Sequence, residues 1–405
     1  MGRIAVIGTL DSKGLEHQFI ADGIAAKGHQ PVLIDVGGLH PPVVTPDVTR
    51  EEVANAGGVD LAAVIALKDR GALVSAMAEA AASYVKQAHQ QQAFDGIISL
   101  GGSGGTAIAT AAMRELPIGF PKVMVSTMAS GDVQQYVGEK DITMIPSIVD
   151  VAGLNRFSRL IFSRAIGAVC GMLDAVPTED DERPIIVASM FGNTTDCVQQ
   201  AQSVFEAAGY EVLVFHATGA GGRTMESLIE SGMVSGVFDV TTTEWADELV
   251  GGVLAAGPKR LEAAAKMGVP AVVAPGCLDM VNFGAPESIP PSYSDRLFYQ
   301  HNPQVTLMRT SVDESRQLGK ILATKLNLST GPVSVILPLK GLSVIGAEGQ
   351  AFHLPEADQV LFESIREHLR EGIPIIEVDA LVNDADFAKV SAQTLLDHIQ
   401  GSATS

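Results

Sequence analysis

The chain has 405 residues, too many for one compact core, so we expect two domains. Apolar residues make up 46% of it and charged residues 18%, which excludes a disordered chain and leaves apolar surface for contacts between domains or subunits. The formal net charge of −20 excludes nucleic acid and anionic membranes as partners, because such a field repels phosphate backbones.

Short apolar runs alternate with helical patterns through the first part of the chain. The expected strands are Ile4–Leu10, Pro31–Gly38, Gly96–Leu100 and Lys122–Thr127. One expected helix runs from Leu15 to about Lys27, and another begins at Thr106 after a glycine-rich loop. Strands that alternate with helices in this way predict an α/β fold with a parallel, doubly wound sheet.

A charged, proline-bounded segment at Val176–Pro184 predicts a boundary between a domain at 1–178 and a second at 184–405. Beyond it the strand–helix pattern starts again. Strands are expected within 185–190, 210–215, 236–244, 270–284, 305–310 and 333–341, and helices within 198–209, 312–326 and 387–399. We therefore expect two Rossmann-like domains with mainly parallel sheets.

The cysteines give little sign of chemistry by their spacing. Cys170, Cys197 and Cys277 form no CxxC pair and no metal-ligand pattern, which favours a reduced, cytoplasmic chain. The first strand begins almost at once, so no signal peptide is expected. No apolar run approaches the ~18–20 residues that a membrane helix needs. Cys170 and Cys197 are expected in the core.

Four glycine-containing loops follow expected strands: GTLDSKG, GGSGGT, FGNTT and ATGAGGR. Glycines let backbone N–H groups approach an anion, and a following helix adds its positive N-terminal end. We expect the first two loops to hold the phosphates of a ligand, with Asp35 near its ribose. The phosphate-binding residues would be Thr9, Asp11, Ser12, Lys13, Gly101, Gly102, Ser103, Gly104, Gly105 and Thr106.

These loops are not complete signatures. Neither contains the Walker A pattern, and GGSGGT lacks the acidic residue that a dinucleotide fingerprint places at the end of the next strand. The alternative is that the glycines only make tight turns between strands and helices. Two such loops in one domain, with Lys13 and Asp35 beside them, favour the phosphorylated ligand.

A second group of polar residues follows strands of the second domain. Cys277 is a candidate nucleophile with His216 or His301 as its base, and Glu244 is an alternative general base. Arg309 or Arg223 would clamp a carboxylate or phosphate. This predicts, as the alternative function, a metabolic enzyme acting on a small phosphorylated or carboxylated metabolite in an interdomain cleft. The structural alternative is a buried Cys277 and an Arg309 paired with a carboxylate.

The chain resembles a known family in many motifs: GTLDSKG, LIDVG, GGSGGT, HATGAGGRTME, DVTTTE, PGCLDMVNFG, HNPQVTLMRT and VNDADFA. Together they are similar to the Tm-1-like family, also called UPF0261, over nearly the whole chain. The resemblance implies two Rossmann-like domains, an adenine nucleotide such as ATP in the first, and a homodimer. Ser12 replaces the family's usual threonine, and SVIG at 343–346 departs from its usual aspartate.

The plant member that names the family blocks tobamovirus replication, and we do not extend that role to this chain. Mg²⁺ is a possible companion of the nucleotide, because magnesium often takes only one or two protein carboxylates. Asp11, Asp35 and Asp132 are the carboxylates expected near the phosphates. The expected partner is therefore an adenine nucleotide or another phosphorylated small molecule.

Overall fold

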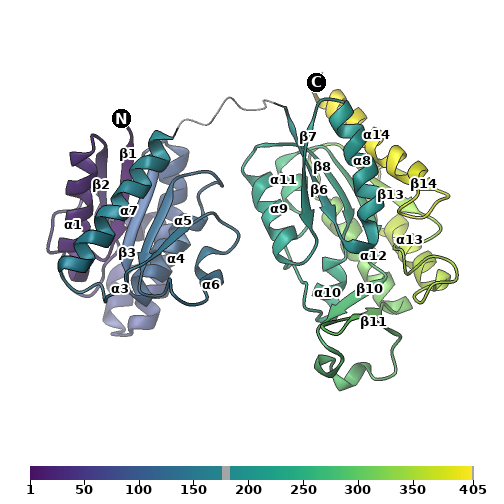
Figure 1. The fold of residues 1–405 in the computed structure, drawn as a ribbon, viewed down its shortest axis with the longest axis horizontal. Helices are drawn as coiled ribbons and strands as arrows, with labels where there is room; N and C mark the ends of the chain where they lie inside the picture. Colours follow the sequence, from purple (N-terminus) through teal and green to yellow (C-terminus); the bar gives the residue numbers. More distant parts are fainter. Residues whose placement is uncertain (176–182, 404–405) are drawn as a thin grey trace. The chain divides into compact units, whose positions relative to one another are not determined.

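The computed structural model describes residues 1–175 and 183–403 (Figure 1). The chain divides into two compact units, an amino-terminal unit at 1–180 and a carboxy-terminal unit at 181–405. The predicted boundary segment lies largely outside the described residues. Each unit is built on a parallel sheet with helices, so the predicted α/β class and the mainly parallel sheets are confirmed.

The amino-terminal unit contains a five-stranded parallel sheet in the order β2-β1-β3-β4-β5. Its elements are β1 (Arg3–Gly8), α1 (Leu10–Ala26), β2 (Gln30–Asp35), α2 (Arg50–Ala56), α3 (Leu61–Ala66), α4 (Arg70–Gln90), β3 (Gly96–Gly101), α5 (Ser103–Arg114), β4 (Lys122–Ser126), α6 (Gln134–Val137), β5 (Thr143–Pro146) and α7 (Arg156–Asp174). β1 lies between β2 and β3, so the chain forms β2 on one side of β1 and then crosses to form β3 on the other side. This point is where ligands bind in doubly wound sheets.

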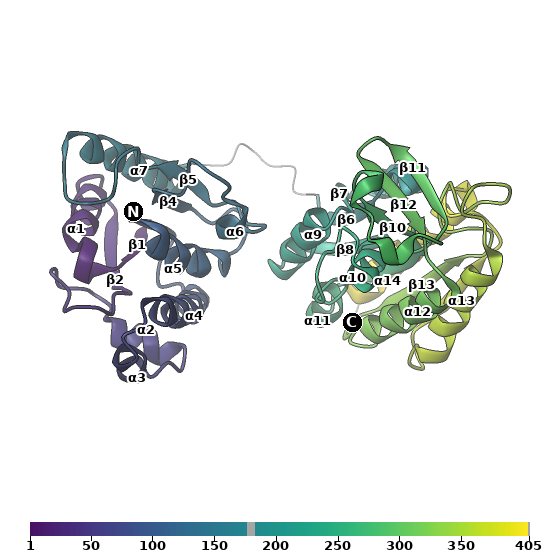
Figure 2. The ribbon, with the colours of Figure 1, turned by 90° about the horizontal axis from the view of Figure 1, so that it is seen from below.

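Helices cover both faces of this sheet, as Figures 1 and 2 show. Alternate residues of β1 contribute to two cores: Ile4 and Val6 to the core that includes α1 and α7, Ala5 and Ile7 to the core that includes α4 and α5. A strand buried on both faces needs a continuous apolar sequence. This explains why the run at the start of the chain predicts a strand so clearly.

The carboxy-terminal unit has a six-stranded parallel sheet in the order β14-β13-β9-β8-β6-β7. Its principal elements are β6 (Ile185–Met190), α8 (Thr195–Ala207), β7 (Glu211–His216), α9 (Ala220–Glu230), β8 (Val234–Thr241), α10 (Glu244–Val250), α11 (Ala263–Met267), β9 (Ala271–Gly276), α12 (Val312–Leu326), β13 (Val333–Pro338), α13 (Pro355–His368), β14 (Ile375–Val378) and α14 (Ala385–Ala403).

A separate antiparallel sheet corrects one expectation. It has the order β10-β12-β11, from β10 (Met280–Phe283), β12 (Val305–Arg309) and β11 (Phe298–Asn302), which Figure 2 shows grouped at one end of the unit. The sequence predicts one strand region at 270–284 and another at 305–310 but does not separate them from the parallel sheet. The turn after β9 makes the difference, since β10 pairs with β12 rather than continuing in the main sheet.

Two helices begin earlier than the sequence predicts. α1 begins at Leu10 instead of Leu15, and α5 begins at Ser103 instead of Thr106. The loop residues themselves form the first helical turns: the amides of Ser12 and Lys13 donate to the Thr9 carbonyl at 3.2 and 2.8 Å. The predicted loops therefore form the first turns of helices.

Within residues 1–175 and 183–403, no helix is both long and apolar enough to cross a membrane.

Candidate functional site

The amino-terminal unit contains a cavity of about 410 Å³ at the carboxyl edge of its sheet, which we call the glycine-loop cavity. The loops after β1, β2 and β3 line it. Its lining residues are Thr9, Asp11, Ser12, Lys13, Val36, Gly38, Leu39, Arg70, Leu73, Val74, Gly101, Gly102, Ser103, Gly104, Gly105, Ile108, Thr127 and Asp150. It lies at the switch point between β1 and β3, and its volume falls within the range of small-molecule sites, roughly 300–1,000 Å³.

The cavity brings together nine of the eleven residues that the sequence predicts for phosphate and ribose binding. The loop after β1 supplies Thr9, Asp11, Ser12 and Lys13, and the loop after β3 supplies Gly101, Gly102, Ser103, Gly104 and Gly105. Their positions follow from topology, because parallel neighbours β1 and β3 end at the same edge. Two segments almost ninety residues apart thus form one surface.

The glycine loop after β3 leads directly into α5, and hydroxyl groups fix its shape. Thr106 is buried and donates from Oγ1 to the Gly102 carbonyl at 2.8 Å, while the same oxygen lies 2.6 Å from Ser126 Oγ. Thr106 does not line the cavity, contrary to the expectation that it contacts phosphate. It instead ties the helix start to β4, so the glycines and Ser103 form the exposed rim.

Asp35 has a different position from the one expected. It is 1% exposed and does not line the cavity. Its Oδ1 accepts from the amides of Leu10 at 3.1 Å and Gly37 at 2.8 Å, which joins the ends of β1 and β2. Burial raises the pKa of Asp35, while these two amide bonds lower it. The side chain therefore holds the loops after β1 and β2 and lies outside the lining of the cavity.

Asp11 lines the cavity, but its carboxylate also has backbone partners. Oδ2 accepts from the amides of Gly38, Leu39 and His40 at 3.2, 2.8 and 3.2 Å. These successive amides form a small anion nest that the chain fills with its own carboxylate. Asp132, the third carboxylate expected near the phosphates, is exposed, accepts from the Gln134 amide at 3.0 Å and is not part of the lining.

The opposite wall of the cavity comes from residues that the sequence does not identify. α4 contributes Arg70, Leu73 and Val74, and Asp150 follows β5, a strand absent from the predictions. The spacing of Arg70 and Val74 places them on one helix face, which the sequence can indicate. Their meeting with the glycine loop depends on how α4 packs on α5, which the sequence does not indicate.

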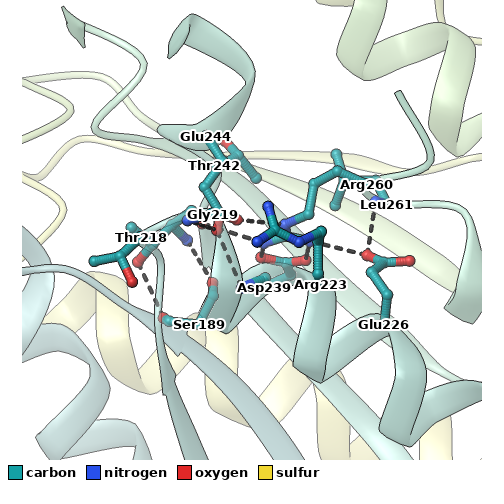
Figure 3. A network of polar contacts seen from close by, with 12 residues as sticks. Ser189, Thr218, Gly219, Arg223, Glu226, Asp239, Thr242, Glu244, Arg260 and Leu261 are labelled. Carbon is teal, nitrogen blue, oxygen red and sulfur yellow. Dashed lines mark hydrogen bonds and ion pairs between the residues drawn. The ribbon is translucent and has the colours of Figure 1, made fainter. Parts of the chain in front are cut away.

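A second polar network lies in the carboxy-terminal unit, and Figure 3 shows it around the guanidinium of Arg260. Arg260 is 1% exposed and forms ion pairs with Asp239, Glu226 and Glu244. Burial alone would lower the pKa of Arg260, but the three carboxylates raise it well above its usual value. Neither Arg260 nor Asp239 was a predicted site residue, because a single arginine in GPKRLEAAAKMG resembles an ordinary helix surface.

Glu244 fills the glycine loop ATGAGGR. Its Oε1 accepts from the amides of Gly219 at 2.7 Å and Gly222 at 3.1 Å, and its Oε2 accepts from Arg260 Nε at 2.6 Å (Figure 3). A carboxylate of the chain thus takes the place that a ligand anion would have. The expected role of Glu244 as general base does not agree with this arrangement, because both oxygens are buried and bonded.

The other predicted catalytic residues do not converge with Glu244. Cys277 is fully buried among apolar side chains, and burial, with a smaller contribution from Asp279, raises its pKa well above the usual value, opposite to what a nucleophile needs. Arg309 is buried and bonded to Asp358 at 2.6 Å. His216 is exposed and stacks edge-on against Phe191. Among the described residues, no hydrogen bond or ion pair joins any two of the four.

The remaining cysteines agree with their expected core positions, since Cys170 and Cys197 are both buried. Burial raises the pKa of Cys197 to about 12. In the part of the chain that the structure describes, no cluster of three or more histidine, cysteine, aspartate or glutamate side chains is arranged to hold a metal ion.

Comparison with known proteins gives a consistent family match. The model of the uncharacterised protein family (UPF0261) N-terminal domain matches residues 2–178, and that of its C-terminal domain matches residues 183–399. A UPF0261 protein of Clostridium tetani is 49% identical over 400 residues, with 98% of this chain and 99% of that protein covered. A UPF0261 protein of Mesorhizobium japonicum is 46% identical over 399 residues, with 98% and 99% covered.

The ToMV resistance protein Tm-1(GCR237) of Solanum lycopersicum is 41% identical over 337 residues, which cover 81% of this chain and 45% of that protein. Among solved structures, a UDP-N-acetylglucosamine 2-epimerase from Rickettsia bellii aligns with 99% of this chain and 96% of its own, at 11% identity and a TM-score of 0.22. That score is too low to support any argument about fold or function.

Proposed function

The chain belongs to the uncharacterised protein family UPF0261, and we propose that its amino-terminal unit binds an adenine nucleotide, ATP above all, in the glycine-loop cavity. One observation supports this most: two loops that the sequence identifies as phosphate-binding line a single cavity of about 410 Å³ at the switch point of the sheet. The resemblance of the motifs to the Tm-1-like family is what selects the adenine nucleotide among phosphorylated ligands.

The chemistry of the walls suits a phosphate chain. Amides at the start of α5, the hydroxyls of Ser12, Ser103 and Thr127, and the ammonium of Lys13 are all donors, and the N-terminus of α5 favours negative charge. The backbone of Lys13 departs from helical geometry at φ −130° and ψ 23°, and the residue lines the cavity with the rest of its loop.

The lining also suits an apolar base. Val36, Leu39, Leu73, Val74 and Ile108 contribute apolar side chains to it. A ligand with a flat apolar group and a phosphate chain matches both kinds of lining residue, as nucleotides do. The catalytic alternative in the carboxy-terminal unit has no comparable support, because Cys277 is buried among apolar side chains and Glu244 is buried and bonded to Arg260.

Lys13→Ala and Gly104→Val test the proposal. In thermal unfolding with ATP, ADP, AMP, NAD or buffer, each with and without Mg²⁺, a ligand at ~100 times its Kd adds about 2.7 kcal/mol of stability. We expect adenine nucleotides to stabilise the unaltered chain, and each variant to weaken ATP binding by about tenfold or more. A Cβ on Gly104 lies 3.4 Å from Val74, an ordinary van der Waals contact, and because Gly104 lines the cavity a valine there takes space from the ligand.

Lys86→Ala is the matched control, because Lys86 is an exposed cation on α4 that pairs with Glu115 and does not line the cavity. It should bind ATP like the unaltered chain. Equal ATP affinity in Lys13→Ala, Gly104→Val and the control would remove the glycine-loop cavity as the nucleotide site. The arms with and without Mg²⁺ show whether the metal accompanies the nucleotide.

A further inference from the structure

Arg70 begins helix α4 and faces the glycine-loop cavity from a wall that the phosphate loops do not supply. Its position is fixed by the preceding residue, because Asp69 Oδ1 accepts from the amides of Gly71 at 2.8 Å and Ala72 at 3.1 Å. This N-cap holds the first turn of the helix in one orientation. The backbone that carries the Arg70 side chain is therefore held in place, although the side chain itself is exposed.

The first turn of α4 packs directly on two loops of the cavity. A Cβ built on Gly38 would lie 2.7 Å from Leu73, and one built on Gly104 would lie 3.4 Å from Val74. Leu73 and Val74 follow Arg70 by three and four residues, so all three share a helix face. Arg70 is one turn before Val74, at the N-terminal end of α4, and lines the same cavity.

The positive charge of Arg70 is the property that matters for an anionic ligand. Among the described residues that line the cavity, the positive side chains are Lys13 and Arg70. They come from opposite faces of the sheet, because α1 packs in one core and α4 in the other. A chain with a net charge of −20 opposes each additional phosphate, and backbone amides supply only partial charges. A second full positive charge is what a longer phosphate chain requires.

We propose that Arg70 is the residue that sets phosphate-chain length: it binds the terminal phosphate of a nucleoside triphosphate, whereas Lys13 and the glycine loops bind the phosphates nearer the ribose. This inference rests on the proposed function and goes beyond it by assigning one residue, Arg70, to the terminal phosphate of the chain. Guanidinium suits the task because it donates two parallel hydrogen bonds to one phosphate group.

The experiment is calorimetric titration of the full chain and of Arg70→Gln, Arg70→Lys and Lys86→Gln with ATP, ADP and AMP. A charge-assisted hydrogen bond pair predicts at least about a tenfold loss of ATP affinity in Arg70→Gln. AMP affinity should change by less than about twofold, because its phosphate does not reach Arg70. Arg70→Lys should fall between, and Lys86→Gln should behave like the unaltered chain.

The outcomes separate this inference from the proposed function. Equal losses for ATP and AMP, or no loss for either, would overturn the role of Arg70 while nucleotide binding stands. Failure of the unaltered chain to bind any of the three nucleotides would overturn the proposed function and the inference with it. Thermal unfolding without ligand verifies folding, since an exposed arginine substitution changes stability by no more than about 0.5 kcal/mol.

Discussion

The two units use glycine loops differently, and their sheets show why. Both sheets share the order second-first-third strand, as β2-β1-β3 and β7-β6-β8. In both, the loop after the second strand is filled by a carboxylate of the chain: Asp11 accepts from Gly38, Leu39 and His40, and Glu244 accepts from Gly219 and Gly222.

The loop after the third strand is where the units diverge. In the amino-terminal unit it is GGSGGT, whose glycines line the glycine-loop cavity. In the carboxy-terminal unit the corresponding strand β8 runs into TTTE, whose Glu244 turns toward the neighbouring loop. A glycine loop therefore indicates a binding site for an anion. The side chain that follows the adjacent strand decides whether this anion is a ligand or a carboxylate of the chain itself.

Arg260→Met should have the largest effect among the variants that test this comparison. It leaves the carboxylates of Asp239, Glu226 and Glu244 without their cation, and breaking a buried ion pair in this way costs about 3–5 kcal/mol. We expect the free energy of unfolding of the carboxy-terminal unit to fall by that amount. Trp245, the only tryptophan and 6% exposed, reports this unit in urea titrations followed by fluorescence.

Arg316→Met is the control for Arg260→Met. Arg316 forms an exposed pair with Asp313 three residues earlier on α12, and such a pair contributes at most about 0.5 kcal/mol. ATP affinity should be unchanged in both variants if the two glycine loops act independently. A stability loss below about 1 kcal/mol in Arg260→Met would mean that Glu244 holds its glycine loop without the arginine.

Gly222→Ala and Gly104→Ala add the same methyl group to two different glycine loops. Gly222 lies in a filled loop, whose amides bind the Glu244 carboxylate, and Gly104 lies in an open loop, which lines the glycine-loop cavity. A Cβ on Gly222 would lie 2.1 Å from a Glu244 carboxylate oxygen, whereas the nearest atom to a Cβ on Gly104 is 3.4 Å away. Gly222→Ala should lower stability by about 2–3 kcal/mol, because the buried Glu244 must move. Gly104→Ala should leave stability unchanged or raise it by up to about 1 kcal/mol, as glycine replacements in helices do.

Urea unfolding followed by circular dichroism compares these two variants, since it reports both units. Equal effects of the two substitutions would contradict the distinction between a filled and an open glycine loop. The comparison is sharper than either variant alone, because the chemical change is identical and both glycines lie near the start of a helix.

The sequence predicts the fold well because both sheets consist of buried parallel strands, whose apolar runs are continuous. It also predicts most of the glycine-loop cavity, since loops after neighbouring strands must meet at one edge. The sequence does not predict the hydrogen bonds that a side chain makes to the backbone of another helix, strand or loop. Nothing in the sequence shows that Asp35 is bonded to two amides, or that Glu244 reaches the amides of Gly219 and Gly222.

Arg70 and Arg260 are two further residues whose tertiary contacts the sequence does not predict. Both lie in segments whose sequence resembles ordinary helix surface. Only tertiary packing brings Arg70 to a cavity and encloses Arg260, which lies in the turn before α11, among carboxylates. Spacing along the chain identifies which residues share a helix face but not what that face meets. Tertiary contacts therefore decide the function of these two arginines.

Asp247→Asn should have the smallest effect at about pH 4, where the acid is protonated, and its pH dependence tests how strongly the carboxy-terminal unit depends on buried carboxyl groups. Burial raises the pKa of Asp247 to about 7, although hydrogen bonds from Asn282 and Leu254 lower it. The unfolded value is near 3.9, so the folded unit binds this proton more tightly. The stability that the proton contributes is complete below about pH 4 and is lost as the pH rises through 7.

Asparagine resembles the protonated acid, because its amide has the same shape and no charge, and the unpartnered Asn282 oxygen can accept from it. The variant should therefore lose less stability than the unaltered chain between pH 4 and 8. The folded pKa of about 7 and the unfolded value near 3.9 differ by about three units, and each unit corresponds to about 1.4 kcal/mol, so we expect a difference of about 4 kcal/mol at pH 8. Parallel stability curves, measured by Trp245 fluorescence in urea, would show that Asp247 is ionised throughout and that its hydrogen bonds outweigh its burial.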